Sequence, residues 1–467
     1  MSWMDTNRRK LLAWSGAAAA GLSLPAQAFA AQALATPALA APASTRGLGI
    51  DAAQLGVRPG RPTDQSAALQ RAIDQAARLR TPLVLAPGVY LAGNLHLPAG
   101  AQIIGRRGAT VLKFSGGASL LAADGSDDIT LSSLVLDGSG APLPERRGLI
   151  HLQSGRGLRI VDCDIMNAGG HGIGLFAMAG EVTGTTITDT AEAALVSLDG
   201  RGLVIARNLV NGAGNNGILV WRAARGHDGT IVIDNRVERI TARAGGSGQN
   251  GNAINVYRAG GVTVRGNQIS GCAFSAVRAN SASDVKISDN TIADMGEVAI
   301  YSEFVFEGAI IANNSIDGAA IGIAVTNFNE GGRLAVVQGN IVRNLTRSRP
   351  VGTDPNDGFG IGIAVEADTA VTGNVVENAA TAAYFLGFGR YLRDVSMNGN
   401  VARRAPIGVA VSVAPGAGSA LIANNVISGA STGAIVGMDG ARPATGDLAK
   451  DGAQRFAHLS ITGNSTT

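Results

Sequence analysis

Arginine, tyrosine and glutamate side chains fall at matching places in consecutive segments near the middle of the chain. Tyr257, Arg278, Tyr301 and Glu303 are the residues that we expect to carry chemistry if the protein is an enzyme. β-Elimination or epimerisation at a uronate needs a cation to neutralise the carboxylate, a base for the C5 proton and an acid. Arg278 is the candidate cation. Tyr257 and Tyr301 are the candidate base and acid, because a nearby cation lowers the pKa of a phenol.

Four further side chains lie beside these residues in the same pattern, and we expect them to hold a sugar chain. Aromatic rings stack on sugar faces, whereas amides, arginines and carboxylates bind hydroxyl and carboxyl groups. The predicted substrate-binding residues are Trp221, Asn255, Asn280 and Glu366. Two long loops, residues 241–252 and 346–358, precede the strands that carry Asn255 and Glu366, so they should form the two ends of a cleft.

The elements that must position these residues repeat along the chain, each with an apolar strand, an Asn and a second apolar strand. Intervals of 23 residues from Asn267 to Asn290 and 24 from Asn290 to Asn314 define the period. Cys163 and Thr185 occupy the Asn position in earlier repeats. Such a period, built from Val- and Ile-rich segments broken by Gly and Asn, is typical of a solenoid. The Asn positions are Asn208, Asn235, Asn267, Asn290, Asn314, Asn340, Asn374, Asn400, Asn425 and Asn464.

Apolar residues within the repeats alternate, as in Ile254/Val256, and a period of two indicates strands. Three short strands per turn, each pairing with its equivalent in the next repeat, predict an all-β solenoid: a single-stranded right-handed parallel β-helix. An Asn at a tight corner tolerates the left-handed backbone region and can bind the next Asn, so we expect a structural asparagine ladder. The alternation also predicts outward pairs on one sheet, namely Leu219/Trp221, Asn255/Tyr257, Arg278/Asn280, Tyr301/Glu303, Ala324/Thr326, Ala364/Glu366 and Tyr384/Leu386.

Residues 47–115 are predicted to form an N-terminal cap and the first coils, and residues 116–467 the β-helix. The cap contains one helix, opened by Thr63 or Asp64. Its apolar face should cover the open first coil, whose strand edges would otherwise invite aggregation. That face carries Leu69, Ala72, Ile73 and Ala76.

The N-terminus has the pattern of an export signal. Arg8 and Arg9 precede a weakly apolar Ala/Gly/Leu stretch and small-residue cleavage patterns. Residues 1–30 are therefore predicted to be a twin-arginine signal peptide, which in turn predicts a periplasmic or secreted protein. Residues 31–46 are predicted to be a disordered Ala/Pro/Thr linker. An uncleaved anchor is the less favoured alternative because the segment is short and Ala-rich. No other stretch is long and apolar enough to span a bilayer, so no membrane partner is expected after cleavage.

The segment from residue 47 to 115 also carries a resemblance. Its pattern GV…G…TD…ALQ.AID, followed by L.L.PG.Y and L.LP.G..I.G..GAT.L, resembles the N-terminal cap and first coils of the pectate-lyase-like superfamily. With the twin-arginine start, the whole chain resembles an uncharacterised family of twin-arginine-translocated β-helix repeat proteins. Superfamily relatives include polysaccharide lyases, hydrolases and alginate epimerases, so the resemblance implies a polysaccharide along a comparable sheet face.

A glycoside hydrolase would instead need two carboxylates at a suitable separation. Glu303, Glu307 and Glu330 could supply them beside Arg333. We rank this reaction lower because the tight Asp cluster of β-helix polygalacturonases is absent from the outward positions.

No metal ligands are identified. Calcium stays open as a cofactor, since Glu303 and Glu366 lie on the same sheet.

The charge of the chain and its histidines bear on which classes of partner and site the protein can have. The formal charge of +3 falls to about +1 without the signal, and the arginines are scattered, which argues against a nucleic-acid partner. His151 and His171 are expected at the surface of the early coils.

The first hypothesis is therefore an exported uronate-polysaccharide lyase or C5-epimerase. The alternative is a non-catalytic envelope protein that binds glycan or protein, and a glycoside hydrolase comes third. The sequence does not indicate an oligomeric state.

Overall fold

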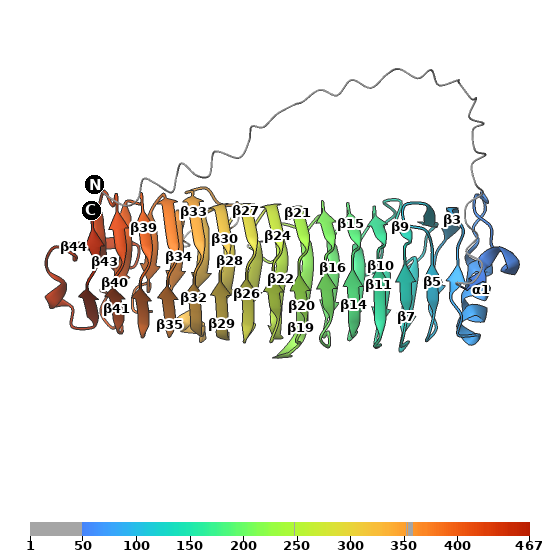
Figure 1. Ribbon diagram of the computed structural model, residues 1–467, viewed down its shortest axis with the longest axis horizontal. Helices are drawn as coiled ribbons and strands as arrows, with labels where there is room; N and C mark the ends of the chain where they lie inside the picture. Colours follow the sequence, from blue (N-terminus) through green and yellow to red (C-terminus); the bar gives the residue numbers. More distant parts are fainter. Residues whose placement is uncertain (1–48, 247, 352, 354–357) are drawn as a thin grey trace, which may run out of the picture. The chain divides into compact units, whose positions relative to one another are not determined.

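The computed structural model describes residues 49–246, 248–351, 353 and 358–467. The predicted signal peptide, residues 1–30, and linker, residues 31–46, lie outside the described residues. From Ile50 onward the chain winds into a parallel β-helix (Figure 1), in which the strands of successive coils lie side by side. The predicted fold class is confirmed.

Three sheets run the length of the β-helix, and apart from its two ends each strand pairs in parallel with the strand three further along the chain. Sheet A contains β1 Ile50–Asp51, β2 Leu83–Val84, β5 Gln102–Ile104, β8 Thr130–Ser132, β11 Leu158–Val161, β14 Gly180–Thr183, β17 Val204–Ala206, β20 Ile231–Ile233, β23 Thr263–Arg265, β26 Val285–Ser288, β29 Glu307–Ala312, β32 Arg333–Gln338, β35 Thr369–Thr372, β38 Val395–Asn398, β41 Ala420–Ala423 and β45 Leu459–Thr462. Sheet B contains β3 Gly88–Ala92, β6 Thr110–Phe114, β9 Val135–Asp137, β12 Asp164–Met166, β15 Thr186–Thr188, β18 Leu209–Asn211, β21 Arg236–Ile240, β24 Gln268–Cys272, β27 Thr291–Met295, β30 Ser315–Ala319, β33 Ile341–Leu345, β36 Val375–Ala379, β39 Val401–Arg403, β42 Val426–Ser428 and β46 Ser465–Thr466. Sheet C contains β4 Leu95–His96, β7 Leu121–Asp124, β10 Gly148–Gln153, β13 His171–Phe176, β16 Ala193–Leu198, β19 Asn216–His227, β22 Asn252–Gly260, β25 Val277–Asn280, β28 Val298–Glu303, β31 Ile321–Val325, β34 Ile361–Val365, β37 Ala382–Leu386, β40 Ile407–Ser412, β43 Gly433–Asp439 and β44 Arg442–Asp447. Near the C-terminus β41 pairs with β45, β42 with β46 and β43 with the antiparallel β44, and at the N-terminus β1 pairs with β2.

The core lies inside the coils and is built from stacked aliphatic side chains. Ile254, Val277 and Ile300 align in the register of β22, β25 and β28, and all three are fully buried. Side chains on one strand alternate between two faces, so the residues that follow them point outward. Sheet C thereby presents a continuous outward face on which the predicted site lies.

An asparagine ladder runs through the corner between sheets A and B. The backbone N and Nδ2 of Asn290 both donate to Oδ1 of Asn314, at 3.1 and 2.9 Å, and Nδ2 also donates to the carbonyl of Val264. The same pattern links the Asn positions from Asn208 to Asn464. Buried amides with partners hold neighbouring coils in register.

One detail of the ladder differs from the prediction. The left-handed residue is the one before each Asn, as at Asp289 with φ 58° and Gly339 with φ 64°. The preceding residue makes the sharp turn. The Asn itself stays outside the left-handed region, which leaves its amide aligned with the next coil. Thr185 continues the ladder, because its backbone N donates to Oδ1 of Asn208 at 2.9 Å.

A short 3₁₀ helix η1, Ala52–Leu55, and the helix α1, Ser66–Arg78, pack on the first coils. The predicted apolar face of α1 is confirmed, since its buried residues are Leu69, Ala72, Ile73 and Ala76. The helix begins slightly later than predicted, at Ser66, whose backbone N donates to Oδ1 of Asp64 at 2.8 Å. No helix within the described ranges is long and apolar enough to cross a membrane.

Candidate functional site

The register of sheet C brings the predicted residues onto neighbouring strands. Asn255 pairs with Arg278, and Arg278 pairs with Tyr301, in one outward row. A second row, two residues further along each strand, contains Trp221, Tyr257, Asn280 and Glu303. We call these two rows the central patch. Seven side chains that the sequence placed together therefore share one face.

Arg278 and Glu303 form a two-pronged ion pair at the middle of the central patch. Nε of Arg278 lies 2.6 Å from Oε1 of Glu303, and Nη2 lies 2.9 Å from Oε2. Asn280 Nδ2 donates to the same Oε1 at 2.8 Å. The residues are 8% and 1% exposed. Burial disfavours the charged guanidinium, but Glu303, followed by Glu297 and Tyr301, together more than offset this effect and raise the pKa of Arg278 above its usual value.

Two further groups enclose Arg278. Glu297, which is 5% exposed, places Oε2 at 3.2 Å from Nη1. The loop before β22 also approaches the guanidinium, since a β-carbon added to Gly248 would lie 1.7 Å from Nη1. Our sorting of strand residues missed both groups, because Glu297 and Gly248 precede their strands. A Gly inside a long loop is the sequence signal that could have indicated close contact, and in the structure Gly248 has φ 121°.

This arrangement constrains what Arg278 can do. A bidentate pair uses the planar fork that would otherwise bind a substrate carboxylate. Neutralising a uronate would therefore require Glu303 or Glu297 to release the guanidinium. The catalytic roles of Arg278, Tyr257, Tyr301 and Glu303 stay predictions, and the geometry itself describes a rigid polar centre.

Aromatic rings flank this centre on both sides. Trp221 and Tyr257 meet edge to face, with ring centroids 5.9 Å apart, and Nε1 of Trp221 donates to Oδ1 of Asn255 at 3.2 Å. On the other side, the guanidinium carbon of Arg278 lies 5.0 Å from the centroid of the Tyr301 ring. All three rings are partly exposed. Their orientation is fixed by these contacts before any ligand binds.

Glu366 lies apart from the central patch. It follows β34, two strands beyond Glu303 in sheet C, and its Oε2 accepts a hydrogen bond from the backbone N of Phe328 at 2.7 Å. Burial raises the pKa of Glu366 to about 7, although the hydrogen bonds from the Phe328 and Asn327 backbone oppose this shift. In this structure the side chain anchors the turn at Phe328, and its predicted contact with a sugar stays a prediction.

Three predicted positions in sheet C are wrong. Leu386, predicted to point outward with Tyr384, pairs with Val365 and is fully buried in the core. Tyr384 pairs with Ile363, points inward and is fully buried, and its hydroxyl lies 3.0 Å from the carbonyl oxygen of Asn374. His151, expected at the surface, is only 7% exposed and packs against Phe176 at 4.7 Å. Burial, followed by the charges of neighbouring basic groups, lowers the pKa of His151 to about 4. The neutral ring therefore behaves as part of the packing.

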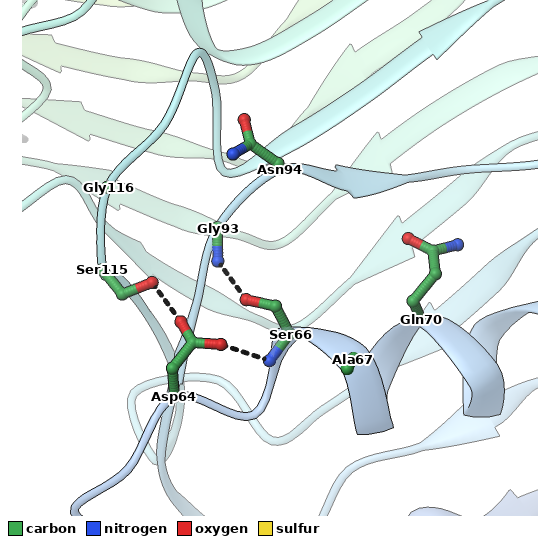
Figure 2. Close-up of a pocket in the computed structure, with 8 residues that line it drawn as sticks. All are labelled: Asp64, Ser66, Ala67, Gln70, Gly93, Asn94, Ser115 and Gly116. Atoms are coloured by element: carbon green, nitrogen blue, oxygen red, sulfur yellow. Dashed lines mark hydrogen bonds between the residues drawn. The ribbon is translucent and has the colours of Figure 1, made fainter.

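A surface hollow of about 370 Å³ lies at the N-terminal cap (Figure 2), and none of the predicted site residues lines it. Its polar groups bind one another: Asp64 accepts from Ser66 N and from the Ser115 hydroxyl, and Ser66 Oγ accepts from Gly93 N. Because these donors and acceptors are already paired, we assign them to holding α1 on the first coils.

The described residues also bear on metal binding. Among residues 49–467, apart from the six positions that the structure does not describe, no three His, Cys, Asp or Glu side chains gather in a way that could hold a metal ion. The central patch contains Glu303 and lies beside Glu297, but both carboxylates contact Arg278. A calcium requirement stays untested.

Comparison with solved structures supports the architecture. The chain is similar to the N-terminal fragment of bacteriophage phi29 gene product 12, with TM-score 0.54, 14% identity and coverage of 90% of this chain and 71% of that one. The pre-mature form of that phage protein gives TM-score 0.53 and 14% identity over 84% of this chain and 54% of its own, so the chain spans about half its length. The A-module of an Azotobacter vinelandii mannuronan C-5 epimerase aligns over 89% of this chain and 99% of its own, at 15% identity and TM-score 0.41.

At these identities the likeness concerns the fold. No curated protein matches the chain. A family model described as the right-handed beta helix region matches residues 113–237 and 223–445, which together span most of the described coils. The matched residues include every strand of the central patch, from β19 to β28. The chain belongs to the right-handed β-helix family.

Proposed function

We propose that the protein is exported and binds an extended polysaccharide along the outward face of sheet C. The observation that carries this proposal is the central patch, in which the partly exposed rings of Trp221, Tyr257 and Tyr301 surround the amides of Asn255 and Asn280. Rings receive the apolar faces of sugars, and amides bind their hydroxyls. Export rests on the sequence of residues 1–30.

The patch is organised before binding, which favours recognition of a long ligand. The Trp221–Asn255 hydrogen bond and the Arg278–Glu303 pair hold side chains in place across neighbouring coils. A preorganised surface loses less conformational entropy when a ligand binds, so more of the contact energy appears as affinity. Coils about 4.8 Å apart repeat the same surface along the axis, as an extended polymer requires.

Calorimetric titration of the mature protein with oligouronates and with neutral oligosaccharides of equal length tests the proposal. We expect Trp221→Ala and Tyr257→Ala each to weaken binding about tenfold, because each removes a stacking ring. Lys286→Ala, an exposed change on sheet A, should bind as the wild type does. Unchanged affinity in both aromatic variants would place the ligand elsewhere.

Turnover of a uronate polymer is our second proposal, and the contact between Arg278 and Tyr301 favours it. The guanidinium carbon of Arg278 lies 5.0 Å from the centroid of the Tyr301 ring, and a neighbouring cation favours the phenolate, which is the form that acts as a general base. The test records unsaturated-uronate absorbance, epimer ratio and reducing ends, with and without calcium. If the protein is an enzyme, Tyr301→Phe should lose turnover and keep binding. If the wild type binds the polymer but gives no signal in absorbance, epimer ratio or reducing ends, it is a binding protein.

A further inference from the structure

An exposed aromatic residue occupies a strained corner immediately after the central patch. Phe304 follows Glu303, is 38% exposed and adopts φ 59°. A positive φ is unfavourable for a bulky side chain. Equivalent corners of other coils carry smaller or polar residues in the same conformation, namely Ser154, Ala177, Asp199, Arg258, Ser281 and Asn327. Phe304 therefore adds neither core packing nor a relaxed turn, and strain of this kind concentrates at functional sites.

More aromatic rings lie on the corners of the following coils. The backbone N of Phe304 donates to Oδ1 of Asn327, and Phe328 comes next in the short helix η2, Phe328–Glu330. The Phe328 ring meets Tyr391 edge to face, with centroids 6.5 Å apart. Phe388, which is 41% exposed, forms a tight turn with Tyr391 through paired backbone hydrogen bonds. Phe304, Phe328 and Phe388 thus lie on the corners that follow β28, β31 and β37 of sheet C, and Tyr391 links Phe328 to Phe388.

This surface also presents a cation. Arg390 is exposed at the tip of the turn, and its guanidinium carbon lies 5.4 Å from the centroid of Tyr391. Within the described ranges, no ion pair includes Arg390. Arg393 differs, because Nε and Nη2 both donate to Asp368, at 2.8 and 2.6 Å. Arg390 thus keeps its donors available while the ring beneath it fixes its position.

We infer that Phe304, Phe328, Phe388 and Arg390, the aromatic ledge, form a second binding region for consecutive acidic sugar units of a polysaccharide lying on sheet C. The exposed rings of Phe304 and Phe388 would contact the apolar faces of sugar units, and the Arg390 guanidinium would bind a carboxylate. The Phe328 ring, with the Arg393 guanidinium carbon 4.4 Å from its centroid, supports this surface. The inference rests on the proposed function, and it adds that the ligand is acidic.

Two single variants test the ledge. Phe304→Asn places at this corner the residue that the next coil uses, and Asn tolerates the left-handed region. We expect its melting temperature to equal or exceed that of the wild type, while its affinity for a hexa-uronate falls about tenfold. Arg390→Ala should lower affinity for the hexa-uronate by a similar factor, and change affinity for a neutral hexasaccharide little, because only the carboxylate contact is lost.

The readouts are calorimetric affinities for hexagalacturonate, hexamannuronate and cellohexaose, with thermal unfolding of each variant. Wild-type affinity for every probe in both variants would overturn the ledge, and Trp221→Ala would then show whether the central patch still binds. Equal losses for acidic and neutral probes in Arg390→Ala would overturn the acidic specificity. A wild-type protein that binds none of the probes would overturn both the ledge and the proposed function.

Discussion

Arg278 has two buried carboxylates as partners, so its loss should harm the fold more than the loss of a surface arginine. Arg278→Met would leave Glu303 and Glu297, at 1% and 5% exposure, without their shared cation. Breaking a buried pair by removing one partner typically costs about 3–5 kcal/mol. We expect a reduction of that size in the free energy of unfolding at pH 7, measured with urea.

The matched control is Arg265→Met. Arg265 pairs with Asp289 at 3.2 Å, and their side chains are 60% and 42% exposed, so we expect a cost below about 1 kcal/mol. Adding Glu303→Gln to Arg278→Met should restore part of the stability, since it removes one unpaired charge. If Arg278→Met costs no more than Arg265→Met, the buried network does not form in solution.

At the scale of the element, the asparagine ladder should be strongest in its middle. Asn290→Ala removes the side-chain bonds from Nδ2 to Asn314 and Val264, and it removes Oδ1, the acceptor of the Asn267 backbone N. Each buried donor or acceptor without a partner costs about 1–3 kcal/mol, so the free energy of unfolding should fall by about 3 kcal/mol or more. Urea unfolding monitored by circular dichroism measures this change.

Asn464→Ala provides the comparison at the end of the ladder. Its bonds to Asn425 and Ile422 are only part-buried, so water can replace them. We expect a cost near 1 kcal/mol, typical of one exchanged hydrogen bond. Equal effects of Asn290→Ala and Asn464→Ala would contradict the view that burial gives the ladder its strength.

The same elements show how far sequence reasoning reaches. Period-two alternation and the Asn interval predict the fold, the ladder and the outward rows, because these follow from local periodicity. Alternation failed at Tyr384, where a polar ring was assigned to the surface although interior carbonyls satisfy its hydroxyl. Alternation also did not predict that Glu297 and Gly248 approach Arg278. Both residues lie outside the strands and belong to coils other than that of Arg278.

At the scale of the whole molecule, burial acts in opposite directions on His151 and Glu366. Burial and nearby positive groups lower the pKa of His151 from 6.5 to about 4. Between these two pH values His151 is protonated in the unfolded chain and neutral in the folded protein. Burial raises the pKa of Glu366 from 4.5 to about 7. Between these two pH values Glu366 is ionised in the unfolded chain and protonated in the folded protein. Stability therefore decreases toward acid for His151 and toward neutrality for Glu366, each by up to about 3 kcal/mol.

Between pH 4.5 and 6.5 the two slopes overlap and largely cancel, so single variants should reveal them. His151→Phe keeps an apolar ring against Phe176 and removes the histidine slope, so stability should fall as pH rises. Glu366→Gln keeps an acceptor for Phe328 N and removes the carboxylate slope, so stability should rise with pH. Urea midpoints at pH 4.5, 5.5 and 6.5 measure both trends. His171 and Asp228, whose pKa values are lowered and raised by burial, are unchanged in either variant, so they shift all profiles alike. Parallel profiles for the wild type and both variants would mean that neither group is shielded from water in the folded protein.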